Sequence, residues 1–163
     1  MAELFNISET LAMACEIERN GARYYRRAAE LVDAPEAVGM LRELAEMEDD
    51  HESAFSAMQN NLDAAAVSGE LSAEGVHYLR AFTAGHIFPV GADPAADITA
   101  GISLEQVLRQ AIGMEKDSIV FYLGIRDAMP AHLGQEKVDM IIREEMRHVT
   151  VLSDRLSQMA SGR

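Results

Sequence analysis

Apolar side chains recur every three or four positions in four long stretches of the chain, which is the spacing of amphipathic α-helices. The first stretch follows Asn6 and the third follows Ser103, and each of these residues has Glu or Gln three positions later, as in a capping box. We therefore expect four long helices, over about residues 7–31, 36–60, 104–127 and 134–159.

The connection inside each pair of predicted helices is short, so each pair should form an antiparallel hairpin. Residues 61–103, between the two hairpins, are interrupted by glycine and proline, and we expect one short helix there at about 73–84. A helix of about 24 residues is about 36 Å long, so a connection of this size can return along a whole bundle. The pattern predicts an all-α four-helix bundle in which residues 1–163 form a single domain and the crossover packs on the bundle.

The composition supports a helical protein, and its charge limits the kinds of partner that the protein can bind. Ala, Leu, Met, Glu and Arg, all good helix formers, dominate the sequence, and Trp is absent. The formal net charge is −13, from 27 acidic and 14 basic side chains. Because so acidic a surface repels phosphate backbones and attracts divalent cations, we expect no nucleic-acid partner.

Cysteine content and hydropathy indicate the cellular compartment in which the protein is expected. The single cysteine, Cys15, excludes an internal disulfide and a metal site built from cysteine pairs. Residues 1–10 contain acidic side chains and no apolar run, so no signal peptide is expected. No stretch approaches the ~18 apolar residues of a membrane span. These features favour a cytoplasmic protein with no membrane partner.

The chain contains an internal repeat with an offset of 97 residues. At this offset the first predicted hairpin falls on the second without a gap, and apolar positions such as Leu11 and Leu108 coincide. Apolar positions often match between unrelated helices, but a Glu and a Glu-x-x-His that match at one offset, through a turn, are much harder to obtain by chance. Among many carboxylates the repeat therefore selects three matched pairs: Glu18 with Glu115, Glu48 with Glu145, and His51 with His148.

These residues lie on the largely apolar, core-facing sides of their helices. A buried carboxylate is costly unless it is paired or bound to a metal, and two divalent cations would balance the charges of the glutamates. Each Glu-x-x-His also places two ligands one turn apart on the same face. Bundles with di-iron or di-manganese centres use this ligand set. Oxygen and imidazole donors without thiolate suit iron or manganese and leave zinc open, so we predict a site for two metal ions, most simply iron.

Other residues near this set allow more than one interpretation. Tyr25 and Tyr122 lie on the ligand faces, two turns further on, where they either donate hydrogen bonds to a ligand carboxylate or pack in the core. Glu144 precedes Glu145 and could compete with it as a ligand, but the counterpart of Glu144 in the repeat is Met47, which argues against this role.

The single cysteine and the other three histidines are not among the residues that match in the repeat. Cys15 fits a small core residue better than a redox group. His77, His86 and His132 have no counterparts among the predicted ligands, and we expect them to be surface or packing residues.

Four motifs carry a resemblance to a known family. They are Glu-Arg-Asn-Gly-x-x-Tyr-Tyr from Glu18, Glu-x-x-His at Glu48, Glu-Lys-Asp-Ser-x-x-Phe-Tyr from Glu115, and Glu-Glu-x-x-His at Glu144. With these motifs the sequence resembles the ferritin-like superfamily and, within it, the rubrerythrin-like di-iron proteins. The resemblance implies a ferritin-like bundle with an oxo- or hydroxo-bridged di-iron centre that reacts with peroxide or O₂, in a protein that forms a homodimer.

Two positions depart from the family pattern. Rubrerythrins proper carry a rubredoxin domain with paired Cys-x-x-Cys motifs, whereas this sequence has only Cys15, so an external electron donor protein is expected. Rubrerythrins also carry an extra ligand glutamate where this chain has Ser118. The sequence predicts an oxidoreductase of peroxidase or ferroxidase type. Two alternatives stay open: iron binding or storage, and a metal-stabilised bundle without catalytic turnover.

Overall fold

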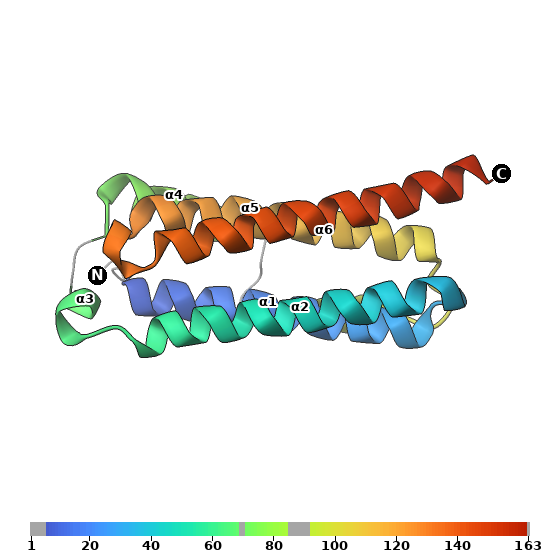
Figure 1. Cartoon of the computed structure of the whole chain (residues 1–163), viewed down its shortest axis with the longest axis horizontal. Helices are drawn as coiled ribbons and strands as arrows, with labels where there is room; N and C mark the ends of the chain where they lie inside the picture. The colour runs from blue at the N-terminus through green and yellow to red at the C-terminus, as the bar shows by residue number, and fades with distance from the viewer. Residues whose placement is uncertain (1–5, 69–70, 85–91, 163) are drawn as a thin grey trace.

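A computed structural model describes residues 6–68, 71–84 and 92–162 of the chain. These residues are helical throughout their regular parts and contain no β-strand. Four long helices, α1 (Ile7–Leu31), α2 (Pro35–Asn60), α5 (Leu104–Ala128) and α6 (Gln135–Ser161), run lengthwise through the molecule (Figure 1). The predicted all-α four-helix bundle is confirmed. Within the described ranges, no helix is long and apolar enough to cross a membrane.

The first helix of each hairpin begins at a capping box, as the sequence predicts. At the start of α1, the backbone N–H of Glu9 donates to Asn6 Oδ1 at 2.8 Å and the N–H of Asn6 donates to Glu9 Oε2 at 3.3 Å. At the start of α5, Gln106 N–H donates to Ser103 Oγ at 3.2 Å and Ser103 N–H donates to Gln106 Oε1 at 3.0 Å. Each capping box gives hydrogen-bond acceptors to two backbone N–H groups that would otherwise lack a partner inside the helix.

The second helix of each hairpin begins without a side-chain cap. Helix α2 starts at Pro35, one residue before the expected position, because proline at the first helical position gives up only an N–H that has no partner inside the helix. Helix α6 starts after Gly134, whose φ of +111° favours glycine, and it extends two residues beyond the expected 159. Helix α5 likewise ends at Ala128, one residue beyond the expected 127.

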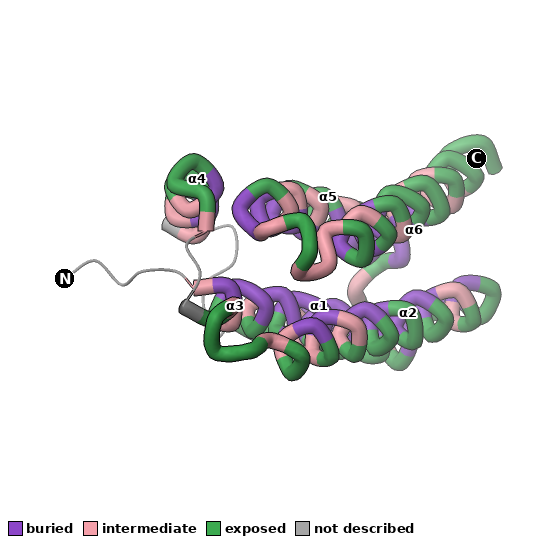
Figure 2. The backbone as a smooth tube through the Cα atoms, turned by 60° about the vertical axis from the view of Figure 1, so that its left-hand side comes forward, coloured by how far each residue is buried: buried purple, intermediate pink, exposed green. Residues whose placement is uncertain are grey.

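The two hairpins repeat the same architecture. Adding 97 to the bounds of α1, 7 and 31, gives 104 and 128, which are the bounds of α5. Helix α1 packs along α2 and α5 packs along α6, and the hairpins meet through contacts of α1 with α5 and of α2 with α6. Buried positions line the inner sides of the helices, where the two hairpins face each other (Figure 2). The α1/α5 face and the α2/α6 face are therefore opposite sides of the bundle.

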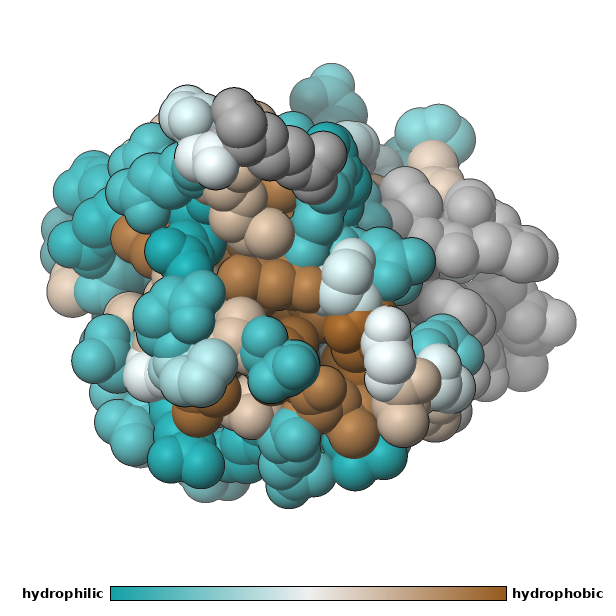
Figure 3. Space-filling model, turned by 90° about the vertical axis from the view of Figure 1, so that its right-hand side faces the viewer, coloured by the Kyte–Doolittle hydropathy of each residue, from teal (hydrophilic) through white to brown (hydrophobic). Residues whose placement is uncertain are grey.

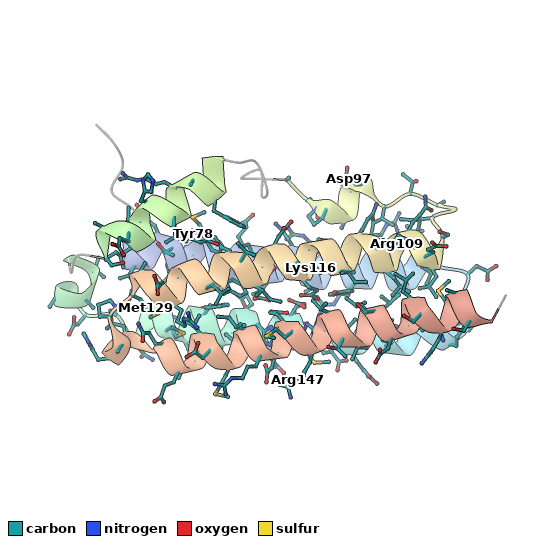
Figure 4. All side chains as sticks on the ribbon, turned by 90° about the horizontal axis from the view of Figure 1, so that it is seen from above. Tyr78, Asp97, Arg109, Lys116, Met129 and Arg147 are labelled. Atoms are coloured by element: carbon teal, nitrogen blue, oxygen red, sulfur yellow. The ribbon has the colours of Figure 1, made fainter. Side chains whose placement is uncertain are left out.

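The crossover lies against the α1/α5 side. It contains the expected helix, α4 (Ala73–Ala84), and two short elements that the sequence did not predict, α3 (Ala64–Ser68) and η1 (Pro94–Asp97). Helix α4 packs on α5, where the Tyr78 hydroxyl donates to the Val120 carbonyl at 3.0 Å, and η1 packs on α1. Figure 4 shows Tyr78 and Asp97 on these two parts of the crossover. The described parts of the crossover thus pack on the bundle as separate short elements.

The core consists of two apolar clusters. One contains Leu11, Phe55 and Ile125, and the other contains Leu41 and Leu108, together with their neighbours. Along each long helix a buried polar segment separates the two clusters. At the end of the molecule seen in Figure 3, apolar side chains are visible in the middle of a ring of hydrophilic ones.

Candidate metal centre

All of the predicted ligands meet in the polar layer between the two apolar clusters. Two overlapping groups of carboxylate and imidazole side chains have ligand atoms within 4.8 Å of one another. The group that we call the His51 position contains Glu18, Glu48, His51 and Glu145, and the group that we call the His148 position contains Glu48, Glu115, Glu145 and His148. Each of the six residues is at most 4 % exposed.

The long helices position these side chains by regular spacing alone. Helices α1 and α5 each supply one glutamate, and α2 and α6 each supply a Glu-x-x-His pair one turn apart. Glu48 and Glu145 belong to both positions, so the two groups share these glutamates. Each position therefore contains three carboxylates and one histidine.

The polar atoms of the cluster face one another without making hydrogen bonds. In the described part of the chain, seven buried side-chain nitrogen or oxygen atoms lack a hydrogen-bond partner, and six of them belong to this cluster. They are Glu18 Oε2, Glu48 Oε1, His51 Nδ1, both carboxylate oxygens of Glu145, and His148 Nδ1.

These atoms lie close together but in an orientation that does not form hydrogen bonds. His51 Nδ1 lies 2.8 Å from one oxygen of Glu145, and His148 Nδ1 lies 2.9 Å from the other, but neither contact has hydrogen-bond geometry. The possible metal-ligand atoms of each group instead point toward a common centre, within 4.8 Å of one another. A buried polar group without a partner is costly, and a divalent cation at each centre would satisfy these atoms together. The residues present therefore fit two metal ions.

The electrostatics of the cluster reflect four carboxylates in one buried volume. Burial, together with the charges of Glu18 and Glu115, raises the pKa of Glu48 well above its usual range. Burial and the charge of Glu18 raise the pKa of Glu145 to about 7. Burial acts in the same direction on Glu115, but the His148 imidazole beside it leaves the pKa of Glu115 below its ordinary value. Without cations, protons must therefore neutralise part of the cluster.

The pKa values of both histidines are also raised, which favours their charged form. Burial opposes the charged imidazolium of His51, but the carboxylates of Glu145 and Glu18 beside Nδ1 raise its pKa to about 11. Burial likewise opposes the charged form of His148, but Glu115 and Glu145 raise its pKa to about 9. Protonated histidines thus take the place of cations, which a bound metal would have to displace.

Two tyrosines support the cluster from outside. The Tyr25 hydroxyl donates to Glu115 Oε1 and the Tyr122 hydroxyl donates to Glu18 Oε1, so each tyrosine holds a carboxylate of the other hairpin. Both side chains are at most 2 % exposed, and burial together with the nearby carboxylates raises the pKa of both phenols. Of the two roles left open by the sequence, the structure shows the hydrogen-bonding one. Protonated phenols are fixed donors that orient these two carboxylates.

The outer nitrogens of the two histidines have different partners. His51 Nε2 lies 2.7 Å from Glu144 Oε2, whereas His148 Nε2 lies 3.3 Å from Met47 Sδ. Sequence reasoning set Glu144 aside as a ligand because its repeat counterpart is Met47. The structure places Glu144 outside the ligand groups but against a ligand's ring, a contact that helical spacing alone does not reveal.

Two hollows approach the cluster from opposite sides of the bundle. A cavity of about 180 Å³ lies between α1 and α5, and Glu48, Glu115, Gly21 and Ser118 form part of its wall. A larger depression of about 440 Å³ lies between α2 and α6, where the histidine rings form part of the floor. The α1/α5 cavity therefore borders ligand carboxylates, and the α2/α6 depression borders the histidine rings.

The residues that the sequence left outside the set also lie outside the cluster. Cys15 is buried, with Sγ 3.8 Å from the Glu52 carbonyl, and burial raises the pKa of its thiol. His77 and His132 are exposed. His86 falls outside the described residues.

Comparisons with known proteins agree with this arrangement. The rubrerythrin family model matches residues 9–83. A crystal structure from Thermotoga maritima, of a candidate ferritin-like diiron-carboxylate protein, matches with a TM-score of 0.77 and 26 % sequence identity over 98 % of this chain and 99 % of that chain. A search of curated proteins gave no significant match.

The fold and the buried cluster define a ferritin-like bundle of the diiron-carboxylate type, with a candidate site for two metal ions. Residues 9–83 of the chain are similar to rubrerythrin, and the fold of the chain as a whole is similar to that of a ferritin-like diiron-carboxylate protein. Its 163 residues include one cysteine and therefore lack the paired Cys-x-x-Cys motifs of a rubredoxin domain.

Proposed function

We propose that this chain binds two iron ions at the His51 and His148 positions and that the centre reacts with peroxide or O₂, as a rubrerythrin-like oxidoreductase. The observation that carries the proposal is the cavity between α1 and α5, which leads to Glu48 and Glu115 on the side of the cluster away from the histidines. In a structural zinc site protein ligands fill every coordination position, whereas a catalytic site keeps one open. Here a space for a reactant adjoins the ligand carboxylates.

The size of this cavity selects the class of reactant. Its volume of about 180 Å³ is below the roughly 300–1,000 Å³ of sites for drug-sized ligands. A methyl group at Gly21 would lie 3.1 Å from Glu48 Oε2, so this glycine keeps the cavity open next to a ligand. Peroxide and O₂ fit such a space, which favours a small oxidant over a larger organic substrate.

The chain's own residues would hold the ions and their surroundings. Each ion would have one histidine and one unshared glutamate, while Glu48 and Glu145 would lie between the two ions. Bound iron would supply electrons to the oxidant by changing from the ferrous to the ferric state. The carboxylates would retain their charge through this change, and the hydroxyls of Tyr25 and Tyr122 would keep two of them in place.

The same proposal includes the identity of the metal, the source of electrons, the cellular compartment and the oligomeric state. Oxygen and imidazole donors suit iron or manganese, with zinc as a further candidate, and the diiron description of the Thermotoga maritima protein favours iron. Because the sequence has no cysteine-pair redox motif, a separate electron donor protein would return the iron to the ferrous state. We expect the protein to act as a cytoplasmic homodimer.

The test is anaerobic loading of metal-free protein with Fe²⁺, followed by rapid mixing with peroxide or O₂ and detection of ferric iron by absorbance. The site variant is Glu48→Gln/Glu145→Gln, which removes both shared charges with little change in volume. The matched control is Glu46→Gln/Glu136→Gln, which changes one exposed glutamate on each of the same helices. Wild type and control should bind two irons per chain and oxidise them rapidly, whereas the site variant should do neither.

Other results would point to the alternatives. Iron retained well beyond two ions per chain would favour storage. Two tightly bound ions that raise thermal stability but do not react with either oxidant would favour a metal-stabilised bundle. Folded protein that takes up no Fe²⁺ would contradict the di-iron proposal.

A further inference from the structure

The internal repeat allows the two metal positions to be compared residue by residue. At the offset of 97, His51 corresponds to His148 and Glu144 corresponds to Met47. Both histidines present Nδ1 to the cluster, at 2.8 and 2.9 Å from the two oxygens of Glu145. Other carboxylates also lie beside both Nδ1 atoms, Glu18 at 3.6 Å from His51 and Glu48 and Glu115 at 3.2 and 3.3 Å from His148. The inner partners of both rings are therefore of the same chemical kind, whereas their outer partners are not.

The difference lies at the outer nitrogens. His51 Nε2 is 2.7 Å from a carboxylate oxygen of Glu144, which can only accept a hydrogen bond when ionised. Once a metal ion displaces the proton on Nδ1, this contact keeps the remaining ring hydrogen on Nε2 and leaves the lone pair of Nδ1 toward the cluster. The thioether of Met47, 3.3 Å from His148 Nε2, is a weak acceptor without charge.

A second contact holds Glu144 in place for this role. Arg147 Nη2 lies 3.1 Å from Glu144 Oε1, while the other oxygen, Oε2, faces His51. Arg147 projects from the outer side of α6 (Figure 4), so the pair is at the rim of the α2/α6 depression. The Glu144 side chain is 38 % exposed and carries no ligand atom of either group, so its effect reaches the metal only through the imidazole.

From this contact we infer that the two positions are inequivalent and that the His51 position takes up the first divalent cation, with Glu144 as its positioning residue. The inference rests on the proposed two-metal centre. A carboxylate on the far nitrogen fixes the ring and strengthens the near nitrogen as a donor. Loss of such a partner costs about 10–100-fold in metal affinity, so the two steps should differ by a factor of this order.

Zinc is a suitable probe because it is diamagnetic and accepts the same oxygen and nitrogen donors. The experiment is a stepwise Zn²⁺ titration of metal-free protein, followed by the ¹⁵N signals of the histidine rings, with calorimetry for the two affinities. In the wild type, His51 signals should change during the first equivalent and His148 signals during the second.

Reciprocal substitutions test the cause. Glu144→Met gives both histidines a thioether and should make the two positions fill together, with the first step about 10–100-fold weaker. Met47→Glu should strengthen the second step instead. The double substitution Glu144→Met/Met47→Glu should reverse the order, so that His148 responds first. Glu46→Met, an exposed change on the same helix as Met47, should leave the order unchanged.

The outcomes separate this inference from the proposed function. Two zinc ions that fill both positions together in the wild type, or His51 still responding first in the double variant, would overturn the inference and leave the metal centre intact. Absence of zinc binding in every form would overturn the proposed centre itself. Glu144 and Met47 are both partly exposed, and circular dichroism of each variant checks that the bundle is retained.

Discussion

At the residue scale, the arrangement of the ligand carboxylates depends on side chains that hold no metal. Tyr25 and Tyr122 each reach across from one hairpin to a glutamate of the other. The phenol is the hydrogen-bond donor on that oxygen, and the surrounding core excludes water. Removal of either hydroxyl should leave a buried carboxylate oxygen without its donor.

We predict that Tyr122→Phe or Tyr25→Phe lowers the free energy of unfolding of the metal-loaded protein by about 1–3 kcal/mol, the cost of an unsatisfied buried group. Urea denaturation measures the change. Tyr78→Phe, which removes an exposed hydroxyl bonded to a backbone carbonyl, is the matched control and should cost about 0.5 kcal/mol. Equal effects of all three substitutions would show that the buried hydroxyls have no special role.

Gly21 provides a second prediction at this scale. In Gly21→Ala the added methyl group would lie 3.1 Å from Glu48 Oε2 and 3.3 Å from Glu48 Cδ, so it should displace a shared ligand and weaken metal binding. In Gly113→Ala the methyl group meets nothing within 4 Å. That control should bind metal normally and gain about 0.5–1 kcal/mol of stability from the better helix propensity of alanine. Calorimetric metal titration of both variants checks this; unchanged affinity in Gly21→Ala would contradict it.

At the element scale, the positions of the helices follow from local signals in the sequence. Regular apolar spacing and the capping boxes at Asn6 and Ser103 were sufficient to predict where α1 and α5 begin. The repeat was sufficient to predict which carboxylates share a buried layer, because helix geometry fixes the face on which each side chain lies. The same signals are weaker in the crossover, and α3 and η1 were missed because such short elements have no full period of apolar residues.

The contacts at the outer edge of the site could not be predicted from the sequence either. Alignment of the two halves of the repeat identifies only residues that are the same in both halves. Glu144 and Met47 differ between the halves, and their role depends on which ring nitrogen they touch. That information lies in side-chain packing across two helices rather than in spacing along one.

The capping boxes give a prediction at this scale. Asn6→Ala or Ser103→Ala should lower the free energy of unfolding by about 1 kcal/mol, because each removes the side-chain acceptor for a backbone N–H of the first turn. Ser157→Ala, at an exposed interior position of α6, is the control and should change stability by less than about 0.5 kcal/mol. Denaturant midpoints of the three variants decide the matter, and a cost at Ser157 similar to that at the caps would contradict it.

At the scale of the whole molecule, the buried cluster links stability to pH. In the metal-free protein the pKa values of Glu145, His148 and His51 are raised to about 7, 9 and 11. A raised pKa means that the folded state holds its proton more tightly than the unfolded state. The resulting stability is complete below the unfolded values, 4.5 for Glu and 6.5 for His, and is lost as pH rises through the folded values.

We therefore predict that the melting temperature of chelator-treated protein falls between about pH 5 and pH 9. Glu115, whose pKa is lowered, acts the other way only as pH falls below its ordinary 4.5. Metal-loaded protein should show the opposite trend, because the ions displace protons and bind more tightly at higher pH. Thermal melts with and without metal test both trends, and a melting temperature of the chelated form that rises over this range would contradict the prediction.

Metal removal should also destabilise the bundle at constant pH, since the ions bind atoms that only the folded chain brings together. At a free metal concentration 100 times the Kd, one site contributes about 2.7 kcal/mol. Chelation should lower the melting temperature and re-addition should restore it. The Glu48→Gln/Glu145→Gln protein should melt at one temperature in both conditions, and a metal-dependent shift in that variant would place the ions elsewhere.

The repeat has a consequence for the origin of the molecule. Each metal position takes ligands from both hairpins, and the two hairpins carry the same ligand types at the same places. A single ancestral hairpin, paired with its own copy around a two-fold axis, would already have contained both positions. In such a symmetric dimer every change appears twice, so the two histidines could never have had different outer partners. Fusion of the two copies into one chain would have removed that restriction and allowed a carboxylate beside one histidine and a thioether beside the other.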